Sequence, residues 1–497
     1  MSDLRRRTVR GAAITAAFVI GIDAIVAAQG LVVTRLLGPR AIGLYGLVAV
    51  TVMTILTLKR VGIDEAFVQQ ETEDPEAEFQ YAFTLELVLS AALALVIVVL
   101  APILAAAYGE PRLLWLTLAS AYLPLAFALL APLWIFYRRM DYARQRLLQV
   151  IQPVVSIAVT LPLAATGFGV WSLVVGPAAG YACAVAASLA ASPYRLKLRF
   201  DRAVAKRYVR FSGWVLVALA ASMAVAQGQI VAFKIHGGLA AAGYLTLAAT
   251  VTRYVDRADQ IVTATIYPAI VAIRGRADAL QELFEKSNRA TLLWVLPFTC
   301  GVVLFAPDLV SFVLGKEWGP ARVLLQGLAV AGLLQHLGFN WFAFFRAHGD
   351  PKHPALEAIA GTIAFGAFAL GGLAVWGVDG FVWGRILAVA VALVVRWRFI
   401  RLLLPRARLS TIVAPALVPV VAAAGAVLAL RALLWGAERP LVQALAEALL
   451  FAGIYAGWAA WRERPLVAEL LRSVRPPAGP AAAPVQPASP PAPVPPA

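Results

Sequence analysis

Lysine and arginine alternate along the chain in step with its apolar segments, and this alternation constrains the fold more than any other feature. Fourteen segments are apolar and long enough to cross a bilayer: 11–33, 41–58, 80–107, 112–137, 147–166, 170–191, 211–235, 241–272, 290–311, 321–345, 355–376, 380–400, 411–434 and 441–461. With the N-terminus in the cytoplasm, the inner loops carry roughly four times as many basic residues as the outer loops. A wrong number of spans would destroy this asymmetry. The pattern therefore predicts an all-α multi-pass protein of about 14 transmembrane helices in a bacterial cytoplasmic (inner) membrane, with both termini in the cytoplasm.

The overall composition agrees with a membrane protein. Hydrophobic residues make up 61% of the chain and charged residues 14%, which leaves little room for a soluble domain. A net charge of +16 would indicate nucleic acid binding in a soluble protein. Here the positive charge belongs to loops beside anionic lipid, so we expect membrane lipid and no nucleic acid as a partner.

The chain shows no pattern typical of catalysis. Its two cysteines, Cys183 and Cys300, both lie in apolar spans, and its four histidines are scattered. Motifs for phosphate loops, serine hydrolases and zinc proteases are absent from the sequence. We expect a transporter and not an enzyme, without a metal or a cofactor, driven by an H+ or Na+ gradient or by the membrane potential.

Short sequence echoes indicate an internal repeat. Ala-Gln-Gly occurs at 28–30 and at 226–228, in each case before a glycine that opens the next span (Gly43 and Gly243). Two aromatic residues followed by an arginine occur at 136–138 and again at 344–346. Six spans separate the copies, so both copies run the same way through the membrane, as in a parallel repeat.

The repeat predicts how the chain is divided. We expect an N-terminal lobe at 1–191 (spans 1–6), a basic cytoplasmic linker at 192–210 and a C-terminal lobe at 211–400 (spans 7–12). Residues 401–475 hold two extra spans, and ten prolines among the last 22 residues mark 476–497 as a disordered tail.

The first two spans carry motifs of a known family. Arg35–Pro39 reads RLLGP, Ile42–Gly46 reads IGLYG, and Val61–Gln69 reads VGIDEAFVQ. With Tyr267-Pro268 in span 8, these segments resemble the polysaccharide flippase branch of the multidrug/oligosaccharidyl-lipid/polysaccharide exporter (MOP) superfamily. Ile42 departs from the family pattern, which usually has an aromatic residue there.

The resemblance covers roughly residues 5–410 and implies both a fold and a function. The fold is two pseudo-symmetric six-helix bundles around a central cavity. The function is movement of an undecaprenyl-pyrophosphate-linked oligosaccharide repeat unit from the inner to the outer leaflet by alternating access, for exopolysaccharide, capsule or O-antigen synthesis. Polysaccharide polymerase and glycosyltransferase machinery are the partners that such a function implies.

Span 8 contains the densest set of charged residues at membrane depth. Arg253, Asp256, Arg257 and Gln260 fall on one helical stripe, and Asp259 lies on its flank. An ionisable group at this depth costs about 2.5–3.5 kcal/mol or more unless it faces a partner or water. We hypothesise that Arg253 and Arg257 bind the pyrophosphate while the two aspartates hold the arginines. The alternative is a self-paired charge ladder between two helices.

Further polar residues inside spans are candidates for the cavity wall. Arg385 is expected to meet the phosphate on the exit side, and Asp23 to bind a proton or sodium ion or to pair with an arginine. The remaining candidates are Gln29 and Gln227, which are repeat mates, and His336 and Asn340, which lie one helical turn apart and are expected to contact sugars.

Three other functions compete with this interpretation. A peptidoglycan lipid-precursor flippase shares the superfamily and the pyrophosphate. A drug or cation exporter would favour an acidic cavity, which the arginines of span 8 oppose. An integral-membrane glycosyltransferase or polymerase would need a large extramembrane loop with catalytic carboxylates, and the outer loops are too short.

Overall fold

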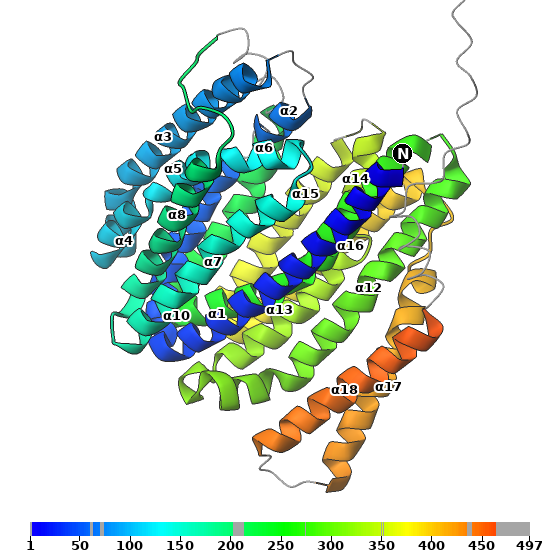
Figure 1. Cartoon of the computed structure of the whole chain (residues 1–497). Coiled ribbons are helices and arrows are strands. Elements are labelled where there is room, and N and C mark those ends of the chain that lie inside the picture. Colours follow the sequence, from blue (N-terminus) through cyan, green and yellow to red (C-terminus); the bar gives the residue numbers. More distant parts are fainter. Residues whose placement is uncertain are drawn as a thin grey trace, which may run out of the picture.

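The computed structural model describes residues 2–59, 63–69, 74–201, 213–273, 275–348, 350, 352–434 and 440–463. All regular structure in these ranges is helical (Figure 1). The helices of the first half are α1 (Ser2–Leu58), α2 (Ile63–Gln69), α3 (Pro75–Tyr108), α4 (Arg112–Ser120), α5 (Tyr122–Leu129), α6 (Pro132–Arg138), α7 (Tyr142–Ala165), η1 (Gly169–Trp171) and α8 (Ser172–Ala191). Those of the second half are α10 (Gly213–Thr252), η2 (Arg253–Val255), α11 (Asp256–Ile273), α12 (Ala277–Asp308), η3 (Leu309–Leu314), η4 (Lys316–Trp318), α13 (Ala321–His336), α14 (Trp341–Ala347), α15 (Lys352–Ala364), η5 (Phe365–Leu370), α16 (Gly371–Leu403), α17 (Leu409–Leu434) and α18 (Leu441–Arg462).

The described ranges contain 11 helices long and apolar enough to cross a membrane, so the chain is a multi-pass membrane protein with the predicted all-α fold. The difference from the fourteen predicted spans lies at three glycine breaks. Spans 1 and 2 are joined across Gly38, spans 7 and 8 across Gly237 and Gly238, and spans 11 and 12 across Gly377. About 20 residues suffice to cross the hydrocarbon core, whereas α1 has 57. In Figure 1 the N-terminus and α2 lie at the same end of the bundle, so α1 reverses direction between them.

The breaks in α1 and α10 have the same geometry and lie 200 residues apart. Gly38 and Gly238 both have φ 71, with ψ of 171 and −165, a conformation that glycine adopts readily because it has no Cβ. Immediately after these breaks the two repeat mates Gly43 and Gly243 lie against each other. A Cβ on Gly43 would lie 1.8 Å from the Leu239 carbonyl oxygen, and one on Gly243 would lie 2.0 Å from that of Pro39. The second half of α1 and the second half of α10 therefore meet backbone to backbone, in a reciprocal contact between repeat mates.

Two basic side chains beside this contact cross between the two predicted lobes. Arg35 Nη1 on α1 donates to the carbonyl oxygens of Phe312 and Val313, both at 3.1 Å, near the C-terminus of η3, which continues α12. Lys234 Nζ on α10 donates to the carbonyl oxygen of Tyr108, the last residue of α3. We call these contacts the crossed caps, since each lobe supplies a cation to the unpaired carbonyls at the end of a helix in the other lobe. Predicted spans 3 and 9, which receive them, are repeat mates.

The two C-terminal helices pack against α12 at the outside of the molecule (Figure 1). Arg431 on α17 donates from Nε to Glu447 Oε2 on α18 at 2.7 Å, and its Nη2 lies 3.7 Å from Asp308 Oδ2 on α12. Because this ion-pair network is buried, α17 and α18 are attached to the C-terminal lobe by more than lipid-facing apolar contact.

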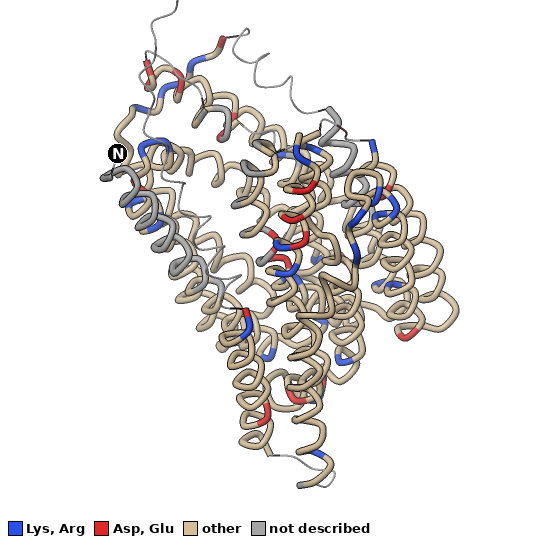
Figure 2. The backbone as a smooth tube through the Cα atoms, turned by 90° about the vertical axis from the view of Figure 1, so that its right-hand side faces the viewer, with Lys and Arg blue, Asp and Glu red and all other residues tan. Residues whose placement is uncertain are grey.

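Charged residues are distributed unevenly along the bundle. Figure 2 shows many of them at the end of the bundle that carries the N-terminus, and a smaller group at mid-height in the central helices. The first group is the one expected of loops on a single membrane side.

Candidate functional site

Predicted span 8 is interrupted near its middle. Helix α10 ends at Thr252, residues 253–255 form the short 3-10 segment η2, and α11 begins at Asp256. Such a change of helix type within a span is typical of hinges and ligand sites. Arg253 on η2 is exposed, and the Asp256 side chain is 48% exposed. The interruption therefore presents a guanidinium and a carboxylate near the middle of the predicted span.

Asp256 pairs with a histidine from another helix. His336 Nε2 at the end of α13 lies 3.2 Å from Asp256 Oδ1, and its Nδ1 lies 2.7 Å from the Gly332 carbonyl oxygen. A carbonyl only accepts, so Nδ1 of His336 carries a proton. The contact between His336 Nε2 and Asp256 Oδ1 then requires a second proton, which either of these two atoms can carry. The His336–Asp256 pair therefore binds one exchangeable proton in this geometry.

The other candidates of span 8 are only partly described. Asp259 Oδ1 accepts a hydrogen bond of 2.9 Å from Thr263 Oγ1, one turn along α11. The side chains of Arg257 and Gln260 lie outside the described residues, and so does that of Asp23 on α1. Their pairing and their roles stay predictions, as does the assignment of the two aspartates to the arginines.

Three predicted cavity residues lie elsewhere in the helix bundle. Gln227 Nε2 donates to Thr54 Oγ1 at 3.2 Å and so links α10 to α1, while its repeat mate Gln29 is half-buried. The Arg385 guanidinium lies 5.2 Å from the centre of the Phe365 ring, and the two residues belong to α16 and η5. The described contacts thus place Gln227 between the lobes and Arg385 within the C-terminal lobe.

Asn340 lies inside the C-terminal lobe in a closed polar network. Its Nδ2 donates to Ser287 Oγ at 2.6 Å, and its Oδ1 accepts from Asn288 Nδ2 at 2.8 Å. Only 1% of Asn340 is exposed. These bonds use the amide to join the start of α14 to α12, a contact that fixes the interruption between α13 and α14.

Arg396 on α16 is a buried charge that the sequence analysis did not select. It lies near the end of predicted span 380–400, where an arginine is usually taken for an interfacial residue. In the structure its Nη2 and Nε donate to Glu357 Oε1 at 2.7 and 3.1 Å, and its Nη1 donates to the carbonyl oxygens of Gln335 and Leu337. Those carbonyls lie where α13 ends, so Arg396 bonds backbone groups that the interrupted helix leaves without a helical partner.

We expect Arg396→Ala to lower the free energy of unfolding by about 3–5 kcal/mol, because it leaves Glu357, whose side chain is 14% exposed, as an uncompensated charge. Thermal unfolding of the purified protein in detergent, followed by tryptophan fluorescence, measures the effect. The double variant Arg396→Met with Glu357→Met removes both charges and should recover most of the loss. An equal loss in the single and double variants would contradict this account of the pair.

Comparison with known sequences places most of the chain in one family. Residues 32–323 match the family described as polysaccharide biosynthesis protein. Succinoglycan biosynthesis transport protein ExoT of Rhizobium meliloti (strain 1021) is 23% identical over 359 residues, which cover 67% of this chain and 70% of that protein.

Comparison with solved structures identifies the fold. An inward-facing multidrug resistance MATE family transporter of the MOP superfamily aligns with a TM-score of 0.65 at 18% identity, over 76% of this chain and 92% of the transporter. The lipid II flippase MurJ in an inward closed conformation aligns with a TM-score of 0.62 at 13% identity, over 91% of this chain and 100% of that one. The helices described above therefore have the fold shared by these transporters.

Proposed function

The chain belongs to the polysaccharide biosynthesis protein family, as the motifs of its first two spans predicted, and on that premise we propose that it is a flippase for a lipid-linked oligosaccharide. The cargo is an undecaprenyl-pyrophosphate-linked repeat unit. The protein moves it from the inner to the outer leaflet of the cytoplasmic membrane, for exopolysaccharide, capsule or O-antigen synthesis. No covalent bond is made or broken, so the protein acts as a transporter.

The observation that carries this proposal is the exposed guanidinium of Arg253 at the interruption of span 8. Guanidinium binds phosphate oxygens in a bidentate manner and keeps its charge in a low-dielectric site. The interruption also starts a new helix at Asp256, whose first turn has N–H groups without helical partners. A pyrophosphate at this point would meet a cation and backbone donors together.

The contacts that hold the lobes together support alternating access as the mode of transport. The Gly43–Gly243 contact and the crossed caps join the two lobes at the end opposite the N-terminus. Release of cargo at that end requires these contacts to separate while the opposite end closes. Rocking of two rigid lobes accomplishes both movements at once.

The His336–Asp256 pair is our candidate for coupling to a proton gradient. The pair holds one exchangeable proton, and its Asp256 lies three residues from Arg253 along the chain. Loss of that proton leaves a negative charge beside the guanidinium, which would compete with pyrophosphate for the arginine. Proton uptake and cargo binding would therefore favour each other.

Reconstitution into liposomes tests the function. The purified protein is combined with undecaprenyl-pyrophosphate-linked radiolabelled oligosaccharide, and a membrane-impermeant glycosidase measures how fast the sugar reaches the outer face. We expect the protein to accelerate this movement and to leave lipid II, the peptidoglycan precursor, in place.

Two results would contradict the proposal. Movement of lipid II without movement of the oligosaccharide lipid would favour the peptidoglycan alternative. Growth of a glycan chain in the vesicles on addition of sugar donors, without any translocation, would favour a glycosyltransferase or polymerase.

A further inference from the structure

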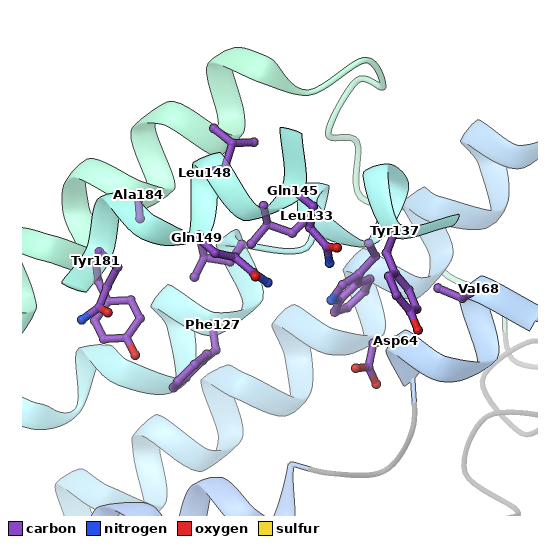
Figure 3. A pocket seen from close by; sticks show the side chains of 13 residues that line it. Asp64, Val68, Phe127, Leu133, Tyr137, Gln145, Leu148, Gln149, Tyr181 and Ala184 are labelled. Atoms are coloured by element: carbon purple, nitrogen blue, oxygen red, sulfur yellow. The ribbon is translucent and has the colours of Figure 1, made fainter. Parts of the chain in front are cut away.

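The N-terminal lobe contains a cavity of about 430 Å³ among α2, α5, α6, α7 and α8 (Figure 3). No residue assigned above to the pyrophosphate or to the proton lines it. Its walls combine aromatic rings with amides and one carboxylate: Asp64, Val68, Phe127, Leu130, Leu133, Trp134, Tyr137, Gln145, Leu148, Gln149, Gln152, Tyr181 and Ala184.

Three glutamines of α7 line one side of the cavity. Gln145, Gln149 and Gln152 recur at helical spacing, so a single face of α7 presents their amides. Figure 3 shows Gln145 and Gln149 on α7 together with Phe127 and Tyr181, which come from the neighbouring helices α5 and α8. Apart from Asp64 these lining residues are uncharged, unlike the charged stripe of span 8.

The amides of this wall offer both a donor and an acceptor. Gln145 is 8% exposed, and its Oε1 has no hydrogen-bond partner among the described residues. Gln149 Oε1 accepts from Arg146 Nη1 at 2.6 Å, which leaves the Nε2 protons of Gln149 as its contribution to the cavity. A buried polar atom without a partner costs about 1–3 kcal/mol, so the unpaired Gln145 Oε1 indicates that a ligand or water completes the site.

The repeat shows what the other lobe places at the same positions. A Cβ on Gly176 would lie 1.8 Å from Thr160 Oγ1, and one on Gly384 would lie 2.0 Å from the Phe368 carbonyl oxygen. Adding 208 to 160 and 176 gives 368 and 384, so two equivalent close contacts fix the register of α7 and α8 against α15, η5 and α16.

At this register the ion pair of the C-terminal lobe has uncharged counterparts. Gln149 corresponds to Glu357, and Ser188 corresponds to Arg396. The Ser188 hydroxyl is fully buried and has no hydrogen-bond partner among the described residues. Where the C-terminal lobe is filled by a large guanidinium and its carboxylate, the N-terminal lobe has a small side chain, an amide and an open cavity.

We infer that this cavity binds a neutral pyranose ring of the transported glycan, an inference that depends on the proposed function. Aromatic rings pack against the C–H faces of a sugar ring, while amides and a carboxylate bond its hydroxyls in both directions. The volume lies within the range of small-molecule sites. In this scheme the cavity of the N-terminal lobe binds a sugar of the cargo, and span 8 binds its pyrophosphate.

Photo-crosslinking in cells tests the location of the sugar. The photoreactive amino acid benzoylphenylalanine replaces Tyr137 at the cavity, Thr250 one turn before Arg253, or Val154 on the exposed side of α7. The cell's own lipid-linked glycan is the probe, labelled with tritiated sugar. We expect tritium on the protein at positions 137 and 250 but not at 154, and none in cells unable to make the lipid-linked glycan.

The outcomes separate this inference from the proposed function. Label at 250 without label at 137 would overturn the sugar site and leave the flippase in place. Absence of label at both positions would contradict both. Label at 137 that persists without glycan synthesis would mean that the cavity holds some other cellular sugar, and would overturn the inference.

Two matched variants test whether Gln145 binds cargo or has only a structural role. Gln145→Leu should lower both labelling at 137 and glycan export about tenfold or more. The thermal midpoint should stay equal or rise, because the variant replaces a buried side chain with an unpaired carbonyl oxygen by an apolar one. Thr117→Val removes another buried unpaired oxygen outside the cavity and should leave export unchanged. Export and labelling that survive Gln145→Leu would overturn the inference. Should that variant fail to fold, Gln149→Leu at a half-buried position makes the same test.

Discussion

Replacement of Arg253 by alanine is expected to reduce export of the lipid-linked glycan roughly a hundredfold or more, with the protein still present in the membrane. The exposed guanidinium would lose two charge-assisted bonds to phosphate, each contributing about 1.5–3 kcal/mol. Arg253→Lys keeps the charge but loses the planar fork, so its export should be intermediate. The liposome assay measures the rate, and quantitative immunoblotting of membranes measures the amount of protein.

Arg112 provides the control for the loss of a positive charge. It is exposed at the first residue of α4, outside the interruption at η2, and Arg112→Ala should export normally. Arg257→Ala belongs to the same test, since the sequence places Arg257 on the stripe of Arg253 and predicts the same loss. Normal export by Arg253→Ala and Arg257→Ala would remove the assignment of the pyrophosphate to span 8.

Alanine at Gly43 or Gly243 is expected to force the lobes apart at the end opposite the N-terminus. Each added methyl would lie 2.0 Å or less from a backbone carbonyl oxygen of the other lobe, and backbone cannot yield as a side-chain tip does. We expect export to fall at least about tenfold, because a lobe contact that cannot close ends the alternation between the two sides. Spin labels at Leu36 and Ile235, both exposed, should report a longer distance by pulsed electron resonance.

The chain offers matched controls for these glycine variants. Gly30 and Gly228 are repeat mates on the same two helices, and a Cβ on either would meet nothing within 4 Å. Gly30→Ala and Gly228→Ala should therefore leave both the spin-label distance and the export rate unchanged. Equal effects in all four variants would show that general helix stiffening, and not the lobe contact, is responsible.

The membrane fold was predictable because it follows from periodic features of the sequence. Apolar segments and alternating basic loops predicted a multi-pass helical protein, and the echo around Gly43 and Gly243 marked repeat mates that the structure brings into contact. The count of fourteen spans stays a prediction. The sequence separates spans at 33/41, 235/241 and 376/380, whereas in the structure a single long helix continues across Gly38, Gly238 and Gly377, because glycine permits a sharp change of direction without a loop.

The site was predictable only where charge marked it. Arg253 and Asp256 were prominent because ionised groups are rare at membrane depth, but the contact of Asp256 with His336 joins residues 80 positions apart and depends on tertiary packing. Arg396 was missed because its partners are carbonyls exposed by a helix interruption that composition does not reveal. Gln145 and Gln149 follow the same helical spacing as the charges of span 8, yet uncharged amides are too common in helices to be selected by spacing alone.

If transport proceeds by the proposed rocking of the lobes, the crossed caps make opening at this end an all-or-none event. Arg35 of the N-terminal lobe bonds carbonyls of the C-terminal lobe, and Lys234 of the C-terminal lobe bonds a carbonyl of the N-terminal lobe. Movement of either lobe away from the other therefore breaks both sets of bonds. Each charge-assisted bond contributes about 1.5–3 kcal/mol, and separation of the lobes breaks both at once. The two free-energy penalties add, so the equilibrium constant for the proposed opening is lowered by the product of two factors, which favours a two-state switch over gradual leakage of water or ions.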